Sequence, residues 1–278
     1  MEFARELEEA LAAAAAASKY VLAEYQSFVA IPNAPATIST HVDRESQEII
    51  LRHLKAAFPE DGLVAEEATA TLAGSPKNAA RTWVVDPIDG TRGFAMKNGE
   101  FSVMIGLTVG DRAVVGVVAE PEQDRVTYAA AGSGCFVRFG TGEPHRCSVR
   151  PTTDLAQSAM VISHRKAGKP PKAELVALGP ARVVETYSAG VKLAMVARGD
   201  VDFYLNEYPN FHDWDVCAGH VLVEEAGGRV TELGGGEVRY GHRGANQRRG
   251  MVASNGKLHD AIVDRVKHSS PPPGRGEG

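Results

Sequence analysis

A series of short apolar segments follows one another between residues 62 and 140, most of them separated by only a few residues. Their lengths and their content of β-branched residues are typical of strands. Connections this short leave no room for crossover helices, so the strands are expected to pair largely antiparallel. The segments span residues 62–67, 82–87, 101–109, 113–121, 125–132 and 135–140. This part of the chain is therefore predicted to form one largely antiparallel sheet.

Two helices are predicted before this sheet. Residues 1–28 form an Ala-rich amphipathic pattern, in which acidic residues precede the alanine run. No basic segment leads into a leucine-rich core, so the pattern is not that of a signal peptide. In residues 43–58, Ile50, Leu54 and Phe58 recur at helical spacing. A Pro-rich connector between the two helices cannot continue either of them.

The second half of the chain has a different pattern. Beyond a polar stretch at 141–154, strand-like and helix-like segments alternate, which favours an α/β arrangement. The strand-like segments are 159–164, 182–187, 201–205 and 250–254, and the helix-like ones are 171–179, 188–199 and 214–228. We therefore expect an α+β metal-binding domain over 1–145, an α/β domain over 146–268 and a disordered tail over 269–278.

The overall charge and the cysteines exclude several classes of protein. A formal net charge of −5 argues against binding to a nucleic acid polymer by neutralising its phosphates. Three cysteines without a CxxC pair suit reduced thiols and a cytoplasmic location better than a disulfide framework. No stretch approaches the roughly 20 apolar residues that span a bilayer, so no membrane partner is expected. The partner that these observations leave is a small anionic ligand, held by a local basic patch or by metal ions.

The segment from Trp83 to Thr91, WVVDPIDGT, carries the strongest chemical signal. Its apolar strand delivers Asp86 and Asp89, three residues apart, at its carboxyl end. Two carboxylates with the Ile88 carbonyl between them suit Mg²⁺, which prefers oxygen ligands. The N–H groups of Gly90 and Thr91, at the start of a new helix, would suit a phosphate. A solvated Asp-Pro turn explains an isolated motif of this kind about equally well.

Two further acidic groups lie at the ends of predicted elements. Glu66 ends a strand-like segment, and Asp215 follows Asp213-Trp214 at the start of a helix-like one. Alone, the first is typical of a solvated turn and the second of ordinary helix capping. Glu66, Asp86, Asp89 and Asp215 together come from three element ends, which is how one rigid metal-binding cluster is assembled.

Three blocks, AEE, WVVDPIDGT and WDVCAGHVLVEEAGG, in this order and spacing resemble the inositol monophosphatase superfamily. The resemblance extends from about Asp43 to Asn255, and its two main motifs are long and specific. It implies an α+β fold built as a layered α/β/α/β/α sandwich. It also implies a phosphatase with two or three Mg²⁺ ions, sensitivity to lithium and a homodimer, since relatives are commonly dimers.

The resemblance also assigns roles to individual residues. Asp86 would bridge two ions, and Glu66 with Thr91 would orient the attacking water. Asp43 resembles an acid that helps to hold a weaker ion, although a first-turn acid on the second helix explains it equally well. The implied metal ligands are Glu66, Asp86, the Ile88 carbonyl, Asp89 and Asp215, and the implied catalytic residues are Glu66, Thr91 and Asp43.

The substrate is predicted from two stretches that resemble the 3'(2'),5'-bisphosphate nucleotidase branch, DGTRGFAMKNGEF and SAGVKL. Lys192 would lie near the start of a helix, where a bound anion offsets the unfavourable dipole; a surface lysine reaching solvent is the alternative. Arg165 would hold a second phosphate. The predicted substrate contacts are Gly90, Thr91, Lys192, Arg165 and Asp215.

Three alternatives to the nucleotidase remain open. An inositol monophosphatase is disfavoured by Tyr208, which stands where those enzymes carry an acid that binds a hydroxyl group. A histidinol-phosphate phosphatase differs in requiring no second phosphate. A non-enzymatic phosphate or metal sensor would need no water-orienting pair such as Glu66 and Thr91. Mg²⁺-dependent phosphate release separates the enzymes from the sensor.

Overall fold

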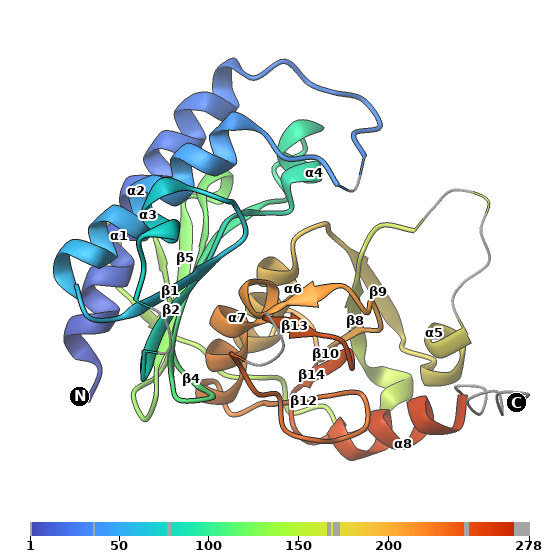
Figure 1. Ribbon diagram of the computed structural model, residues 1–278. Coiled ribbons are helices and arrows are strands. Elements are labelled where there is room, and N and C mark those ends of the chain that lie inside the picture. Colours follow the sequence, from blue (N-terminus) through green and yellow to red (C-terminus); the bar gives the residue numbers. More distant parts are fainter. Residues whose placement is uncertain are drawn as a thin grey trace, which may run out of the picture.

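Helices and sheets alternate in layers (Figure 1), and the computed structural model describes residues 2–35, 37–76, 79–165, 168, 173–241 and 245–269. The outer helical layer contains α1 (Ala4–Ser27) and α2 (His41–Ala57), which pack on the first sheet. Helices α6 (Ala189–Arg198) and α7 (Asp213–Glu225) lie between the two sheets. Helices α5 (Ala173–Leu178) and α8 (His259–Ser269) cover the far side of the second sheet. The α/β/α/β/α sandwich is confirmed.

The first sheet has seven strands, in sequence order from edge to edge. They are β1 (Gly62–Ala65), β2 (Arg81–Asp89), β3 (Ser102–Val109), β4 (Arg112–Glu120), β5 (Arg125–Ala130), β6 (Gly134–Phe139) and β7 (His145–Arg146). Neighbours pair antiparallel except β1 and β2, which are parallel. The connection between those two is long enough to include the short helix α3 (Ala70–Ala73). The predicted sheet is therefore confirmed, with one parallel pair.

The second sheet has five strands in the order β12-β14-β10-β8-β9. They are β8 (Ala159–Ile162), β9 (Arg182–Glu185), β10 (Phe203–Asn206), β12 (Arg229–Thr231) and β14 (Met251–Ser254). The three strands β8, β9 and β10 are parallel, and β14 is antiparallel to its neighbours. The parallel part confirms the predicted strand–helix alternation. A small ribbon pairs β11 (Phe211–His212) with β13 (Asn246–Gln247).

The division into two domains at residue 145 stays a prediction. Strand β7 spans the proposed boundary and still pairs with β6. One apolar cluster includes Val84 and Val118 from the first sheet and Val161 and Tyr204 from the second. Of the predicted tail, Ser269 ends α8, and residues 270–278 lie outside the described part of the chain. Among these described residues, no helix has the length and apolar character needed to cross a membrane.

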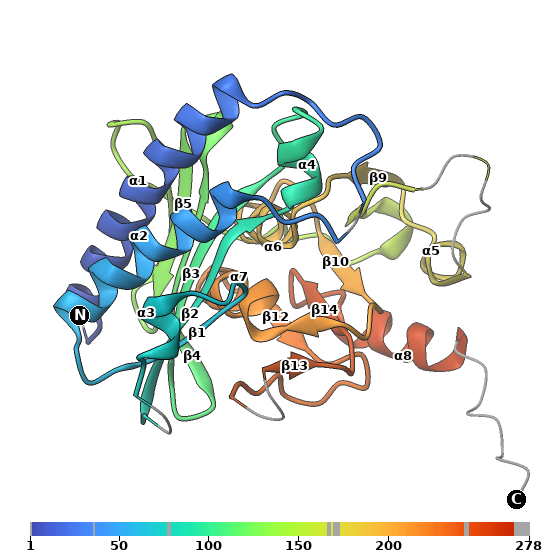
Figure 2. The ribbon, with the colours of Figure 1, turned by 45° about the horizontal axis from the view of Figure 1, so that its top comes forward.

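Helix α1 approaches the sheet closely because its buried face is built from alanines. Ala10, Ala13, Ala14 and Ala17 recur at helical spacing and are almost completely buried. Small side chains let the helix backbone lie near the strands, and alanine costs the least conformational entropy in a helix. Figure 2 shows α1 and α2 side by side over the first sheet, with the start of α4 (Thr91–Ala95) at one end. These helices cover the outer face of the sheet that carries Asp86 and Asp89.

Helix α7 is pressed against the opposite face of the first sheet at two glycines. A Cβ atom at Gly106 would lie 2.6 Å from Cys217 Sγ, and one at Gly116 would lie 2.1 Å from the carbonyl oxygen of Ala218. Both distances are too short for a real side chain. The close approach fixes where the first turn of α7, with Asp215, lies relative to the sheet.

We expect Gly116→Ala to destabilise the fold. The new Cβ would meet a backbone oxygen that cannot move without shifting α7, and overpacking of this kind costs about 1–3 kcal/mol. For a chain of this size, that corresponds to a fall in Tm of about 2–4 °C per kcal/mol. The matched control is Gly234→Ala, because nothing lies near a Cβ atom at that position. Thermal unfolding measures both variants, and equal Tm values would contradict the close contact.

Candidate metal centre

Strand β2 holds its two aspartates in a rigid irregular turn. Its pairing with β3 shifts register between Asp86 and Asp89, where Pro87 lies. Proline has no N–H to donate to a ladder, so a break in the pairing is expected there. The Ser46 hydroxyl donates to the Pro87 carbonyl at 3.0 Å, and the Ile88 N–H donates to Asp86 Oδ1 at 3.1 Å. Asp86 is 2% exposed, so the turn and its carboxylate are fixed inside the protein.

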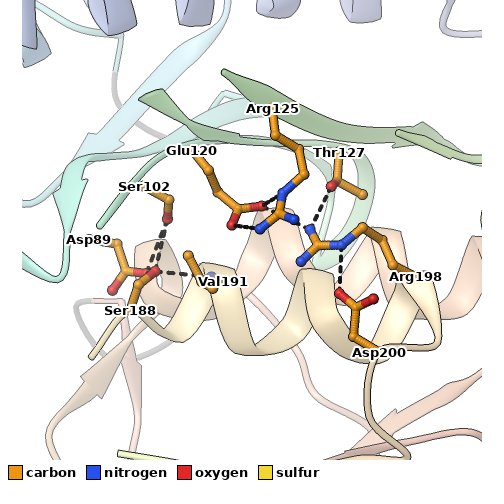
Figure 3. A network of polar contacts seen from close by, with 9 residues as sticks. All are labelled: Asp89, Ser102, Glu120, Arg125, Thr127, Ser188, Val191, Arg198 and Asp200. Carbon is orange, nitrogen blue, oxygen red and sulfur yellow. Dashed lines mark hydrogen bonds and ion pairs between the residues drawn. The ribbon is translucent and has the colours of Figure 1, made fainter. Parts of the chain in front are cut away.

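Asp89 is held by the start of α6 (Figure 3). Its Oδ2 accepts hydrogen bonds from the Ser188 hydroxyl, from the Gly190 N–H at 2.6 Å and from the Ser102 hydroxyl at 3.4 Å. Ser188 is also the N-cap of α6 and accepts from the Val191 N–H at 3.0 Å. All these contacts use Oδ2, which leaves Oδ1 as the oxygen for a cation. Burial raises the pKa of Asp89, and the Ser188 hydrogen bond opposes that rise.

Helix α7 adds a third carboxylate. Asp215 lies in its first turn and accepts from the His212 N–H at 2.6 Å. One oxygen each of Asp86, Asp89 and Asp215 lies within 4.8 Å of the others. The two predicted explanations of Asp215 therefore both apply, since it caps the helix and also joins the cluster. The structure brings together the carboxylates that the sequence placed at separate element ends.

Glu66 follows β1 and lies beside the cluster without being part of that group. Its side chain is exposed to solvent, although protein atoms crowd its carboxyl group. This crowding and the negative charges of Asp215 and Asp43 raise the pKa of Glu66 to about 8. Its predicted role as a metal ligand stays a prediction.

Asp43 and Thr91 form a hydrogen-bonded pair at the edge of the cluster. The Thr91 hydroxyl has both Asp43 Oδ1 and the Ile88 carbonyl within 2.9 Å. Asp43 Oδ2 accepts from the N–H and hydroxyl of Thr40, which completes a capping box at the start of α2. Asp43 is thus both a first-turn acid and a neighbour of the centre. The structure pairs Thr91 with Asp43, whereas its predicted action with Glu66 on one water stays a prediction.

The chemistry of this cluster suits a bound cation. Burial, and then the charges of Glu66 and Asp89, raise the pKa of Asp86 well above its usual value. Buried carboxylates this close are costly unless they are protonated or share a positive ion. Ligand oxygens around one octahedral Mg²⁺ lie about 3–4 Å apart, with metal–oxygen distances of about 2.1 Å. The three oxygens within 4.8 Å therefore fit Mg²⁺ after a small contraction, and the role of the Ile88 carbonyl as a ligand stays a prediction.

We expect Mg²⁺ affinity to rise with pH. Below pH 8 most Glu66 carboxyl groups carry a proton that must leave before the group can bind a cation. A single such proton weakens apparent binding by about 20-fold between pH 8.5 and 6.5. Calorimetry in buffers of different ionisation enthalpy measures both the affinity and the protons released. Glu66→Gln is the control and should flatten the pH dependence; an unchanged dependence would exclude Glu66 as its source.

Lys192 lies inside the protein, behind the centre. It is 1% exposed, and its Nζ donates to Ser163 Oγ at 3.0 Å and to the Tyr187 carbonyl at 3.1 Å. Burial lowers the pKa of Lys192 to about 8, opposed by the charge of Asp89. The alternative of a surface lysine reaching solvent is therefore wrong. These partners occupy two of its three N–H groups, and its predicted contact with a substrate phosphate stays a prediction.

The side chains around Tyr187 were not identified as a group from the sequence. The Arg92 guanidinium lies over the Tyr187 ring, 5.1 Å from its centroid. The centroids of the His164 and Tyr187 rings are 4.4 Å apart. Glu100 Oε2 accepts from the Tyr187 N–H at 3.2 Å and lies 2.6 Å from His164 Nε2. The only sequence signal was the aromatic residue directly before Ser188. Since Ser188 holds Asp89, this group borders the centre.

Arg165, the second predicted phosphate contact, lies near the same group. Its Nε donates to Glu185 Oε1 at 2.5 Å, and its backbone N–H donates to Glu185 Oε2 at 3.1 Å. The guanidinium is half exposed, so it is not fixed deep in the protein as Lys192 is. A phosphate at Arg165 would have to compete with Glu185.

The chain is similar to one group of known proteins in both sequence and fold. A sequence model described as the inositol monophosphatase family matches residues 4–270. The chain is 32% identical to a histidinol-phosphatase of Mycobacterium tuberculosis, over 82% of this chain and 84% of that one. It is also 32% identical to a fructose-1,6-bisphosphatase/inositol-1-monophosphatase of Thermotoga maritima, over 82% of each. An inositol monophosphatase structure from Anabaena (Nostoc) sp. superposes with a TM-score of 0.78 at 28% identity, over 98% of this chain and 99% of that one.

Proposed function

The chain belongs to the inositol monophosphatase family, and we propose that it hydrolyses small phosphate monoesters with Mg²⁺ held at Asp86, Asp89 and Asp215. The observation that carries the proposal is the cluster of three carboxylate oxygens within 4.8 Å, bordered by the Thr91–Asp43 pair. Bound Mg²⁺ would stabilise charge on the phosphoryl and leaving oxygens and make water a better nucleophile. A binding module would need the cation site but not the hydroxyl–carboxylate pair.

The residues of the chain supply positioning and proton transfer. When the Thr91 hydroxyl donates to Asp43, its oxygen lone pairs are free to accept a hydrogen bond from the attacking water. Glu66 has a raised pKa of about 8, so it would lose its proton when Mg²⁺ binds, and the resulting carboxylate could accept a proton from the attacking water. The buried turn at Asp86–Asp89 holds these groups in place, so little reorganisation is needed during the reaction.

The class of ester is the finer part of the proposal. The nucleotidase hypothesis depended on Lys192 and Arg165, and the protein itself supplies partners to both. Glu100 and Glu185 are likewise paired, with His164 and Arg165, so these contacts select neither a second phosphate nor a cationic group on the ester. One curated relative is a histidinol-phosphatase. We therefore propose histidinol phosphate as a candidate substrate beside adenosine 3',5'-bisphosphate.

The proposal is tested by phosphate release from four esters, each with and without Mg²⁺. These are histidinol phosphate, adenosine 3',5'-bisphosphate, inositol 1-phosphate and fructose 1,6-bisphosphate. Release that requires Mg²⁺ from at least one of them supports the enzyme, whereas no release from any of them contradicts the proposed activity on this class. Lys192→Met then separates the candidates: a loss confined to the bisphosphates supports the nucleotidase, and an equal loss for all esters shows a structural role.

Lithium sensitivity and a homodimer are further proposals from the family resemblance, and a cytoplasmic location is a proposal from the cysteine content. Lithium should inhibit at limiting Mg²⁺ by replacing the most weakly held ion near Asp43 and Glu66. A homodimer should elute at twice the chain mass in size-exclusion chromatography with light scattering. A cytoplasmic location is tested by fractionating the cells that make the protein. Unchanged rates in lithium would argue against a weakly held ion.

A further inference from the structure

Two of the three cysteines face each other across neighbouring strands. In the β6–β7 ladder Val137 pairs with His145 and Phe136 with Arg146, and the next step places Cys135 opposite Cys147. The Cys147 N–H donates to the Cys135 carbonyl at 2.8 Å, so the ladder continues to this pair. Residues that face each other in such a hydrogen-bonded pair have Cα atoms about 5.5 Å apart and side chains on one face. Disulfides span Cα distances of about 4.4–6.8 Å.

The surroundings of this pair favour a thiolate on one of the two sulfurs. Cys135 is fully buried and Cys147 is 6% exposed. A hydrogen bond between the thiols lowers the pKa of Cys147 and raises that of Cys135, and the positive charge of Arg198 lowers both. The thiolate is the reactive form of cysteine, and a neighbouring arginine is typical of reactive sites.

Arg198 has an unused donor in this region. Its side chain is 6% exposed. Its Nη1 donates to Glu120 at 2.8 Å and to Thr127 at 2.9 Å, and its Nε donates to Asp200 at 2.9 Å (Figure 3). Nη2 is buried, and no hydrogen-bond partner for it occurs among the described residues. This buried guanidinium therefore has a donor without a partner among the described residues, and its charge acts on both thiols.

Cys217 differs from the pair. It lies in helix α7, where it faces Gly106 and is fully buried. Burial raises its pKa well above the usual value. Buried thiols of this kind are inert, so Cys217 serves as an internal control.

We propose that Cys135 and Cys147 form a reversible disulfide when the protein reacts with hydrogen peroxide, with Cys147 as the attacking sulfur and Cys135 as the resolving one. The Cys147 thiolate attacks one peroxide oxygen, the O–O bond breaks, and the leaving hydroxide takes a proton to become water. Cys147 is then a sulfenic acid. The Cys135 sulfur attacks it, the S–S bond forms, and the S–O bond breaks with loss of a second water. Two thiols are oxidised and one peroxide is reduced.

The disulfide would join β6 to the segment that leads from the first sheet into the second. Two residues after Cys147, the Val149 N–H donates to the Ala226 carbonyl at the end of α7. The crosslink therefore restrains the chain where the two halves of the structure meet. It uses no residue of the metal centre, so its formation does not depend on the proposed phosphatase activity.

The test is a thiol count and a peptide map of the full-length protein before and after hydrogen peroxide. Free thiols in denaturant should fall from three to one and return to three with dithiothreitol. Trypsin cleaves after Arg138 and Arg146, so the linked cysteines fall in separate peptides whose connection is unambiguous. Cys217→Ser should leave this linkage unchanged.

Single variants show which sulfur reacts first. In Cys135→Ser, Cys147 should accumulate as a sulfenic acid that dimedone labels; in Cys147→Ser, Cys135 should stay unlabelled at the same peroxide dose. Both are small substitutions, and the wild-type peptide map keeps the test valid if either variant fails to fold. Three free thiols after peroxide, over-oxidation of Cys147 without a crosslink, or earlier reaction of Cys217 would each overturn the proposal.

Discussion

Replacing Asp86 by asparagine is expected to abolish turnover while leaving the fold intact. The variant removes one anionic ligand and so loses several kcal/mol of charge stabilisation, which corresponds to a fall in kcat/KM on the order of 10³-fold. Mg²⁺ should also bind more weakly, because fewer negative charges attract it. Phosphate release and Mg²⁺ calorimetry measure the two effects. Activity near that of the wild type would contradict the metal centre.

The same variant should not destabilise the metal-free protein. Burial raises the pKa of Asp86, so the folded state holds its proton to higher pH than the unfolded state does. A raised carboxyl pKa means that stability falls as pH rises above the ordinary aspartate value. Asparagine removes that loss, and the Tm in EDTA at pH 8 should be equal to or higher than that of the wild type.

Asp202 provides the matched control for a buried aspartate outside the centre. It is fully buried, its Oδ2 accepts from the Ala159 N–H at 2.7 Å, and it lies 3.2 Å from Arg150 Nε. Asp202→Asn should lower the Tm because it weakens a buried ion pair. The folded variant should keep its Mg²⁺ affinity. The two substitutions therefore separate metal binding from stability, and a loss of Mg²⁺ affinity in both would contradict that separation.

Thr91→Val and Asp43→Asn are each expected to lower kcat far more than they change KM. Both act on the hydroxyl that would orient the attacking water, and positioning for proton transfer is worth about 10²–10⁴-fold in rate. The double variant should be little worse than either single one, because the residues act as a unit. Rates at saturating Mg²⁺ give both constants. Fully additive losses would contradict the shared role.

Thr108→Val is the control for removing a buried threonine hydroxyl. Thr108 Oγ1 donates to the Thr82 carbonyl at 3.2 Å, at the end of the β2–β3 ladder away from Asp86. Its kcat should stay near that of the wild type. Glu66→Gln extends the experiment: if Glu66 acts on the same water as Thr91, its loss should also be non-additive with Thr91→Val.

The layers of the fold and the cluster of three carboxylates could be predicted because they depend on local patterns. Short apolar segments predict strands, and acids at element ends predict a cluster once a family resemblance supplies the topology. The partners of those acids could not be predicted. Ser188 and Asp89 are 99 residues apart in sequence, and Thr91 and Asp43 are 48 apart. Such contacts depend on how the elements pack in three dimensions.

Lys192 shows the same limit in a single side chain. Its position near the start of α6 was predicted, but a helical residue can reach solvent, ligand or core depending on which neighbours cover that face. Here Ser163 and Tyr187 accept its hydrogen bonds and Tyr204 lies 5.2 Å from it. These partners come from strand ends and loops whose relative placement the sequence pattern does not contain. The sequence pattern alone therefore could not decide whether Lys192 contacts a phosphate.

The contact between Gly116 and Ala218 has a consequence for the synthesis of the chain. Strand β4, with Gly116, leaves the ribosome about 100 residues before helix α7, with Ala218. At 5–20 residues per second, the interval between them lasts roughly 5–20 s. Throughout that interval the inner, apolar face of the nascent sheet has no helix to cover it, and the third carboxylate of the metal centre has not been made. Newly made chains therefore expose this apolar face to aggregation until α7 has emerged.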